Sequence, residues 1–346
     1  MILHRCKRKE NCIVCTSIPQ TVRMEIKLER QSKLSVVIPS YNEEQMIPRT
    51  AKVIGDILRD AGIPCELLFV DDGSSDQTWQ QIQKASALYD EVRGVHFSRN
   101  FGKEAAIMAG LEQASGDCCA VIDCDLQHPP EKLVEMYQLW EQGYEVIEGR
   151  KSSRGEESAA HGLAAKIFYS LISAATGFDM ASASDFKLLD RKVVDALIRM
   201  PERNAFFRAM SSWVGFRTTE VEFDVQEREA GESKWSTKAL VKYAVNNITS
   251  FSTAPMQVIT ILGIVMLVLS CVLSVTALVQ KFTGRALGGF TTVILVLLFA
   301  SSIIMTSLGI IGYYIARIYE EIKGRPRYII SQTCGKRERG AYEGRE

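Results

Sequence analysis

The sequence predicts an α/β domain with a mostly parallel sheet, followed by a hairpin of two transmembrane helices. Two observations support this prediction. In the first half of the chain, short apolar runs alternate with longer helical stretches, as in parallel sheets that helices cover on both faces. Near the C-terminal end, two long apolar runs contain no Asp, Glu, Lys or Arg, which is typical of helices that cross a bilayer.

Strands and helices are expected to alternate along residues 34–149. The expected strands are 34–39, 66–70, 92–97, 118–122 and 144–149, and the expected helices are 43–60, 76–89, 102–114 and 130–142. In open sheets of this type, ligands bind beyond the carboxyl ends of the strands. Three of those ends carry distinctive polar residues, at 39–43, 71–74 and 123–125. We therefore expect these three segments to converge on one site.

The two uncharged runs, at 243–280 and 286–316, each exceed the roughly 20 apolar residues that a membrane-spanning helix needs. Basic residues precede the first run and follow the second, so the positive-inside tendency places both flanks in the cytoplasm of a cell-membrane protein. The expected divisions are an N-terminal extension at 1–32, the cytosolic α/β domain at 33–232, a juxtamembrane segment at 233–256, spans at 257–280 and 289–316, and a cytosolic tail at 317–346. The juxtamembrane segment suits helices lying on the membrane face, and ordinary linker helices would explain it equally well.

The composition narrows the choice of partner and compartment. Lysine plus arginine equals aspartate plus glutamate at 41 each, so no overall charge favours binding to nucleic acid. The nine scattered cysteines do not form a disulfide framework, which favours a reducing compartment for the soluble part. Regular patterning begins only after Met24, which is therefore a candidate start. The glycine-rich phosphate loops G-x-G-x-x-G after a strand and G-x-x-x-x-G-K-[ST] do not occur.

The stretch "VIDCDLQHPPE", residues 121–131, brings two acids one residue apart to the end of a buried strand. Asp123 and Asp125 point the same way in an extended chain, where their charges repel unless they share a cation. Mg²⁺ or Mn²⁺ binds through one or two carboxylates and completes its coordination with substrate phosphates. The pattern is short, but two other polar strand ends nearby favour a divalent cation that a diphosphate completes.

Seven segments in this order carry a resemblance to a known family: "VVIPSYNEE", "LLFVDDGSSDQT", "SRNFGKEAAIMAGLEQASGD", "VIDCDLQHPPE", "SDFKLLDRKVVDAL", "REAGESKW" and "IKGRPRYII". The chain resembles family 2 glycosyltransferases with a GT-A fold, over roughly residues 33–331. More narrowly, it is similar to polyisoprenyl-phosphate glycosyltransferases such as bactoprenol glucosyltransferases and dolichol-phosphate mannose synthases. This resemblance implies metal-dependent, inverting transfer of a hexose from a nucleotide-diphosphate sugar, expected to be UDP-glucose or similar, to undecaprenyl phosphate or a related lipid. The product would serve glycosylation of the cell wall or of a surface polysaccharide.

The resemblance also implies residue roles. Donor binding falls to Pro39, Tyr41, Glu43, Asp72, Lys103 and Asp123. Mg²⁺ or Mn²⁺ binding falls to Asp123, Asp125 and Gln127, with Asp125 also catalytic. His128 stands where many relatives have a third acid, and a structural histidine would explain it as well.

The acceptor side follows from the charge of a lipid phosphate. Its second pKa is about 6, so it is already a nucleophile at neutral pH and needs cationic positioning more than a strong base. Candidates for that positioning are Arg150, Arg154, Lys166, Arg203, Arg208, Arg228 and Lys234, although a solvated surface charge would explain any single one. Asp185 matches a family acid near the acceptor. It would be catalytic by orienting the acceptor or acting as a base, or else cap a helix starting at Phe186.

Two other functions compete with this interpretation. A polysaccharide-extending transferase usually carries more spans and a Q-x-x-R-W motif, which does not occur here. A non-catalytic nucleotide-sugar scaffold for a partner flippase would not need the intact acid pair. Homo-oligomerisation is suggested by the resemblance and by no residue pattern.

Overall fold

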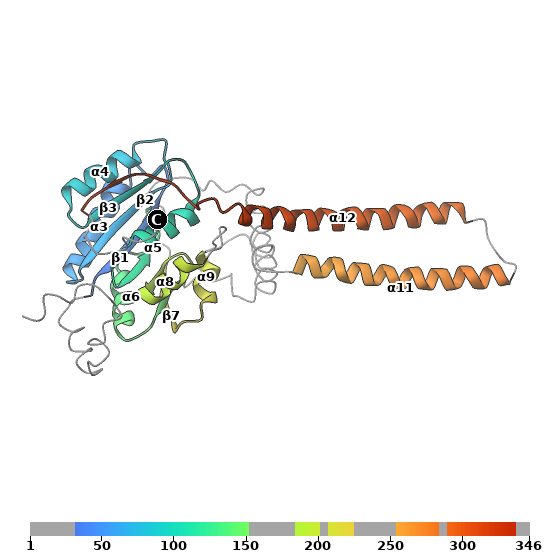
Figure 1. Cartoon of the computed structure of the whole chain (residues 1–346). Helices are drawn as coiled ribbons and strands as arrows, with labels where there is room; N and C mark the ends of the chain where they lie inside the picture. The colour runs from blue at the N-terminus through green and yellow to red at the C-terminus, as the bar shows by residue number, and fades with distance from the viewer. Residues whose placement is uncertain (1–31, 152–183, 201–206, 225–253, 284–288, 337–346) are drawn as a thin grey trace, which may run out of the picture.

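The computed structural model describes residues 32–151, 184–200, 207–224, 254–283 and 289–336 (Figure 1). These residues form an α/β domain and two long helices that project from it side by side (Figure 1). The expected N-terminal extension, Met24 within it, and all but the last residues of the expected juxtamembrane segment lie outside the described residues.

In the described residues, one sheet of eight strands has the order β7-β5-β6-β4-β1-β2-β3-β8. The strands are β1 Leu34–Ser40, β2 Cys65–Asp71, β3 Val92–Phe97, β4 Cys118–Val121, β5 Val146–Lys151, β6 Lys187–Asp190, β7 Thr218–Phe223 and β8 Ile330–Cys334. β1 pairs in parallel with β2 and β4, β2 with β3, and β5 with β7. β6 is antiparallel to both β4 and β5, and β8 is antiparallel to β3. Six strands therefore share one direction, which confirms a mostly parallel sheet.

Helices cover both faces of the sheet. They are α3 Ile47–Asp60, α4 Thr78–Leu88, α5 Lys103–Gln113, α6 Lys132–Glu141, α8 Arg191–Arg199 and α9 Phe207–Trp213. α3, α4 and α6 pack in one hydrophobic cluster, and α5, α8 and α9 pack in a second cluster on the opposite face. β1 contributes Val36 to the first cluster and Val37 to the second, which explains its continuous apolar run.

The approach of α5 to β1 is unusually close. A Cβ atom on Gly110 would lie 2.2 Å from Cγ1 of Val37, so only glycine fits there without a shift. This contact matters for function because α5 begins at Lys103, beside the carboxyl ends of the central strands.

The sequence prediction located the first five strands to within two residues and missed the last three. β6 is placed by its antiparallel pairing with β4 and β5, which lie far earlier in the chain. β8 lies beyond the second long helix, where we expected only a tail, and its pairing with β3 joins segments more than 200 residues apart. Neither strand follows from local sequence patterns because each depends on a distant partner.

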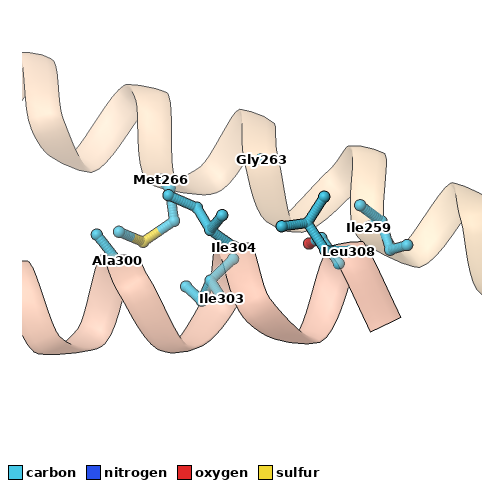
Figure 2. Close-up of a pocket in the computed structure, with 8 residues that line it drawn as sticks. Ile259, Gly263, Met266, Ala300, Ile303, Ile304 and Leu308 are labelled. Atoms are coloured by element: carbon cyan, nitrogen blue, oxygen red, sulfur yellow. The ribbon is translucent and has the colours of Figure 1, made fainter. Parts of the chain in front are cut away.

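The two long helices are α11 Ala254–Phe282 and α12 Phe290–Ile322. Their segments Met256–Thr276 and Phe299–Ile322 are long and apolar enough to cross a membrane, by length and composition. A groove of about 330 Å³ lies between the helices (Figure 2). It is lined by Ile259, Gly263, Met266, Ala300, Ile303, Ile304, Ser307 and Leu308. This groove is separate from the acidic strand ends of the α/β domain.

Candidate active site

The polar segments that follow β1 and β2 are joined by hydrogen bonds. Asp72 N–H donates to the Ser40 carbonyl at 3.0 Å, and Asn42 N–H donates to Ser74 Oγ at 2.9 Å. The segment after β4 is held separately, because Thr50 Oγ1 donates to the Cys124 carbonyl at 2.8 Å from inside α3. The parallel registers of β1, β2 and β4 place all three segments at one edge of the sheet, as expected.

The expected donor residues differ in accessibility along this edge. Pro39 is buried within β1, Glu43 is partly buried, and Tyr41 exposes 46% of its surface. Asp72 is buried, and its two carboxylate oxygens accept the backbone N–H groups of Phe101 at 2.6 Å and Gly102 at 2.9 Å. Burial raises the pKa of Asp72, and these two N–H groups offset the rise only in part. In this structure Asp72 therefore anchors the loop 98–102, which connects β3 to α5.

Lys103 is the first residue of α5 and lies between two acids from different strands. Its Nζ atom is 2.6 Å from Oδ1 of Asp123 and 2.8 Å from Oδ2 of Asp185. Burial lowers the pKa of Lys103, but the two carboxylates outweigh it and hold the pKa above its usual range. The side chain is therefore a permanent cation that bridges the expected metal-binding acid and the expected acceptor-side acid.

Asp185 is buried just before β6, and both of its oxygens are occupied. Oδ1 accepts from Nε of Arg208 at 2.6 Å, while Oδ2 accepts from Nη2 of Arg208 at 2.9 Å and from Lys103. Burial raises the pKa of Asp185, but the two cations outweigh it and hold the pKa well below its usual range. Asp185 is therefore an ionised carboxylate, and both of its oxygens accept hydrogen bonds from basic side chains.

The alternative that Asp185 caps a helix is wrong. The residues that follow it form strand β6, and the next helix, α8, takes its cap from Asp190, whose Oδ1 accepts Lys192 N–H at 2.9 Å. The segment "SDFKLLDRK" contains two acids, Asp185 and Asp190, and its sequence does not indicate which of them precedes a helix.

Glu104 belongs to the same cluster and was missed by the sequence analysis. Its Oε2 atom accepts the N–H of Phe207 at 2.9 Å, at the start of α9, which carries Arg208. Burial and the nearby Asp185 charge raise the pKa of Glu104 to about 7. Its position next to Lys103 in the sequence was the available signal, but an acid at the start of a helix is usually explained by the helix dipole.

The acid pair after β4 presents oxygen atoms suited to a hard divalent cation. Asp123 is partly exposed and paired with Lys103, while Asp125 accepts the N–H of Gln127 at 3.1 Å through Oδ1. Leu126, between Asp125 and Gln127, has a φ of 55°, so the chain makes a tight turn directly after the acid pair. Among the described residues, no group of three or more His, Cys, Asp or Glu side chains is placed to hold a metal. Carboxylate and amide oxygens fit Mg²⁺ or Mn²⁺, provided that phosphate or water supplies the remaining positions.

His128 favours the structural interpretation. Its ring stacks on Phe186 with centroids 5.2 Å apart and meets the edge of Phe223 at 5.3 Å. Its buried Nδ1 atom makes no hydrogen bond within the described residues. Burial lowers the pKa of His128, so a neutral ring packs in an aromatic cluster under the acid pair.

Of the expected phosphate-binding residues, the structure describes Arg150 and Arg208. Arg150 on β5 forms an exposed ion pair with Glu220 on β7, at 2.8 Å. The remaining candidates lie outside the described residues, namely Arg154, Lys166, Arg203, Arg228 and Lys234. Arg208 is the member of the predicted acceptor set that the structure places beside Lys103 and Asp185.

Comparison with known proteins assigns the class of this site. Residues 35–197 match the family described as "Glycosyl transferase family 2". The chain is 39% identical over 310 residues to "Uncharacterized glycosyltransferase YkcC" of Bacillus subtilis, covering 89% of this chain and 96% of that protein. It is 36% identical over 304 residues to the "SfII prophage-derived bactoprenol glucosyl transferase" of Shigella flexneri, covering 87% of this chain and 98% of that protein.

The α/β fold and these similarities define the chain as a glycosyltransferase. The chain belongs to glycosyl transferase family 2. Among solved structures, glucosyl-3-phosphoglycerate synthase from Mycobacterium tuberculosis matches with a TM-score of 0.47 at 20% identity, covering 63% of this chain and 76% of that chain.

Proposed function

We propose that this enzyme transfers a hexose from a nucleotide-diphosphate sugar to a polyisoprenyl phosphate at the cytosolic face of the cell membrane. UDP-glucose is the expected donor and undecaprenyl phosphate the expected acceptor. The observation that carries the proposal is the cluster of Asp123, Lys103, Asp185 and Arg208 in a chain that also has two apolar helices of membrane-spanning length. Relatives named bactoprenol glucosyl transferase support both the sugar and the lipid.

The donor is expected to bind over the carboxyl ends of β1, β2 and β4. Asp123 and Asp125, with Gln127, would hold Mg²⁺ or Mn²⁺, which when bound neutralises the diphosphate and favours its departure. Lys103 contributes a fixed positive charge at the same acid pair. Tyr41, exposed on the rim, is available to contact the nucleoside.

The acceptor phosphate attacks the anomeric carbon of the sugar as the bond to the leaving diphosphate breaks, with inversion. An ionised phosphate oxygen has no proton to lose, so this step requires no protein base. Asp185, with both oxygens held by Lys103 and Arg208, orients these two cations. The cations in turn are placed to bring two mutually repelling anions together.

Helices α11 and α12 would insert as a hairpin and hold the α/β domain at the bilayer surface, where the phosphate of a lipid carrier is located. The apolar groove between them faces hydrocarbon in this arrangement. Anchoring confines enzyme and lipid to one surface, which lowers the entropic cost of their encounter.

The proposal is tested with full-length protein purified in detergent. A labelled UDP-glucose, undecaprenyl phosphate and MgCl₂ or MnCl₂ should give a chloroform-soluble labelled lipid. Label that appears only in a polymer would favour a polysaccharide-extending transferase, and donor binding without turnover would favour a scaffold.

The matched variants are Asp125→Asn and Asp56→Asn. We expect Asp125→Asn to lose activity by on the order of 100-fold or more, because it removes one of two metal-binding carboxylates. Asp56 lies on the surface of α3, paired with Arg59, and its substitution should leave activity unchanged. Wild-type rates in Asp125→Asn would contradict a metal role for the acid pair.

A further inference from the structure

The chain returns to the α/β domain after the second long helix. The ribbon beyond α12 runs back across the domain (Figure 1), and residues 327–334, here called the return segment, include strand β8. β8 pairs antiparallel with β3, with Gly94 opposite Cys334 and His96 opposite Gln332. The indole N–H of Trp79 in α4 donates to the side chain of Gln332 at 2.8 Å. The return segment is therefore part of the folded domain.

The sequence of β3 leaves room for this strand. A Cβ atom on Gly94 would lie 2.7 Å from Sγ of Cys334 and 2.4 Å from Cγ2 of Ile82. A larger residue at this position could not remain between α4 and β8 without a shift. The close packing indicates a specific docking position for the return segment.

The first residues of the return segment contact the loop that leads to the active site. The ring of Tyr328 stacks on Phe97 with centroids 5.1 Å apart and planes 9° from parallel, and its hydroxyl donates to the Glu112 carboxylate. Phe97 meets Phe101 edge to face at 5.8 Å. The N–H of Ser98 donates to the carbonyl of Ile329 at 3.0 Å. The return segment thus holds the beginning of the loop 98–102 directly, at Ser98. It contacts Phe101, near the end of the loop, indirectly through Phe97.

The opposite side of the same loop is held by the active site. Asp72 accepts the N–H groups of Phe101 and Gly102, and the next residue is Lys103. Lys103 reaches both Asp123 and Asp185. A continuous set of contacts therefore runs from Tyr328 through Phe97 and Phe101 to Lys103, which bridges Asp123 and Asp185.

We propose that the return segment is a positioning element of the donor site, and that Tyr328 is its principal positioning residue. By packing on Phe97, Tyr328 keeps the loop 98–102 in the position that places Lys103 beside Asp123. The end of the membrane hairpin is thereby connected to the site that binds the donor diphosphate. This inference rests on the proposed function for the identity of the donor, and goes beyond it in assigning a role to residues that contact neither substrate.

The test compares three single variants of full-length protein in detergent. Tyr328→Leu removes the stacked ring, Tyr328→Phe keeps the ring and removes the hydroxyl, and Ile329→Ala changes the neighbouring residue, which exposes 52% of its surface. The measurements are UDP binding by calorimetry in MnCl₂, and the KM values for UDP-glucose and undecaprenyl phosphate.

We expect Tyr328→Leu to raise the Kd for UDP and the KM for the donor by roughly threefold to tenfold, the loss typical of one aromatic pair. The KM for the lipid should be unchanged, and both Tyr328→Phe and Ile329→Ala should bind UDP nearly as the wild type does. Equal loss in Tyr328→Leu and Ile329→Ala would overturn the assignment to the ring.

Hydrogen exchange separates local loosening from general unfolding. In Tyr328→Leu, the amides of Phe101 and Gly102 should exchange faster while those of β1 keep wild-type protection. Faster exchange with unchanged UDP affinity would overturn the positioning role, and so would unchanged exchange. If the wild type binds no UDP, the proposed donor is wrong. In that case, hydrogen exchange at Phe101 and Gly102 alone tests whether Tyr328 holds the loop 98–102 in position.

Discussion

At the scale of single residues, Asp185 and Glu104 are neighbouring acids with opposite pKa shifts. Burial alone would raise both pKa values, but Asp185 contacts Lys103 and Arg208 directly, and these charges lower its pKa below the usual range. Glu104 accepts the backbone N–H of Phe207, and burial together with the nearby charge of Asp185 raises its pKa to about 7. The two acids therefore suit different roles, Asp185 as a fixed charge and Glu104 as a structural group that changes its protonation near neutral pH.

Replacing Asp185 distinguishes orientation of cations from proton transfer. We expect Asp185→Asn to lower kcat on the order of 10- to 100-fold, because Lys103 and Arg208 lose the charge that orients them. In wild type and variant alike, activity should fall below about pH 6, where the dianion of the lipid phosphate binds a proton and becomes a monoanion. Rates should be measured from acidic to alkaline pH. Recovery of wild-type rates at high pH would contradict the orienting role of Asp185. Hydroxide in solution can replace a missing base, but it cannot replace the carboxylate that holds Lys103 and Arg208.

Glu104 gives a prediction about stability and pH. Because its folded pKa is raised, the folded state holds its proton more tightly, and this stabilisation is present below the unfolded pKa and lost as pH rises through about 7. Glu104→Gln keeps an oxygen for the Phe207 N–H and removes the titration. Relative to the wild type, the variant should therefore gain thermal stability between about pH 5 and pH 8, as judged by Tm. A constant difference in Tm across that interval would contradict the raised pKa.

At the scale of secondary-structure elements, the site depends on how α3 and α5 hold its loops. α5 lies against β1 because Gly110 permits close approach, and this places Lys103 at the strand ends. α3 holds the acid pair from the other side through the buried hydroxyl of Thr50 and the Cys124 carbonyl. α5 and α3, on opposite faces of the sheet, therefore fix Lys103 and Asp123, whose charged groups lie 2.6 Å apart.

Removing the Thr50 hydroxyl should loosen the acid-bearing turn with little change in shape. Thr50→Val is expected to lower the free energy of unfolding by about 1 kcal/mol, the net value of one hydrogen bond, and to raise the concentration of MnCl₂ needed for half-maximal activity. Thr218→Val is the control, because Thr218, at the start of edge strand β7, has an exposed hydroxyl that donates to the carbonyl of Phe216. An unchanged metal requirement in Thr50→Val would show that the turn holds its position without α3.

At the scale of the whole molecule, the sheet constrains the arrangement in the membrane. β8 follows α12 and pairs with β3, so the end of the hairpin and the α/β domain belong to one folded unit. If α11 and α12 both cross the bilayer, the domain and the return segment must lie on the same side. The basic flanks favour the cytoplasm.

Reporter fusions test this topology. A fluorescent protein that folds only in the cytoplasm, attached after Glu346, should be bright in the membrane fraction, while alkaline phosphatase attached there should be inactive. The same pair of reporters inserted between Lys281 and Arg285 should give the reverse result. Active phosphatase at the C-terminal end would contradict the cytoplasmic orientation of the hairpin.

The sequence predicted those parts of the structure that repeat locally. The first five strands, the helices between them and the convergence of the acidic strand ends follow from alternation and from one rule about parallel sheets. β6, β7 and β8 did not follow, because each pairs with a strand that lies far away in the sequence. The bridge of Lys103 between Asp123 and Asp185 likewise joins residues 20 and 82 positions apart, so no spacing rule could indicate it.

Mass spectrometry of the lipid product tests the central claim most directly. Full-length protein is incubated with UDP-glucose, undecaprenyl phosphate and MgCl₂, and both the lipid and the released nucleotide are quantified. The account predicts that the lipid gains the mass of one hexose for each UDP released, and that omission of either the lipid or the divalent cation stops both. Release of UDP without a hexosylated lipid, or a hexosylated lipid formed equally well without a divalent cation, would contradict it.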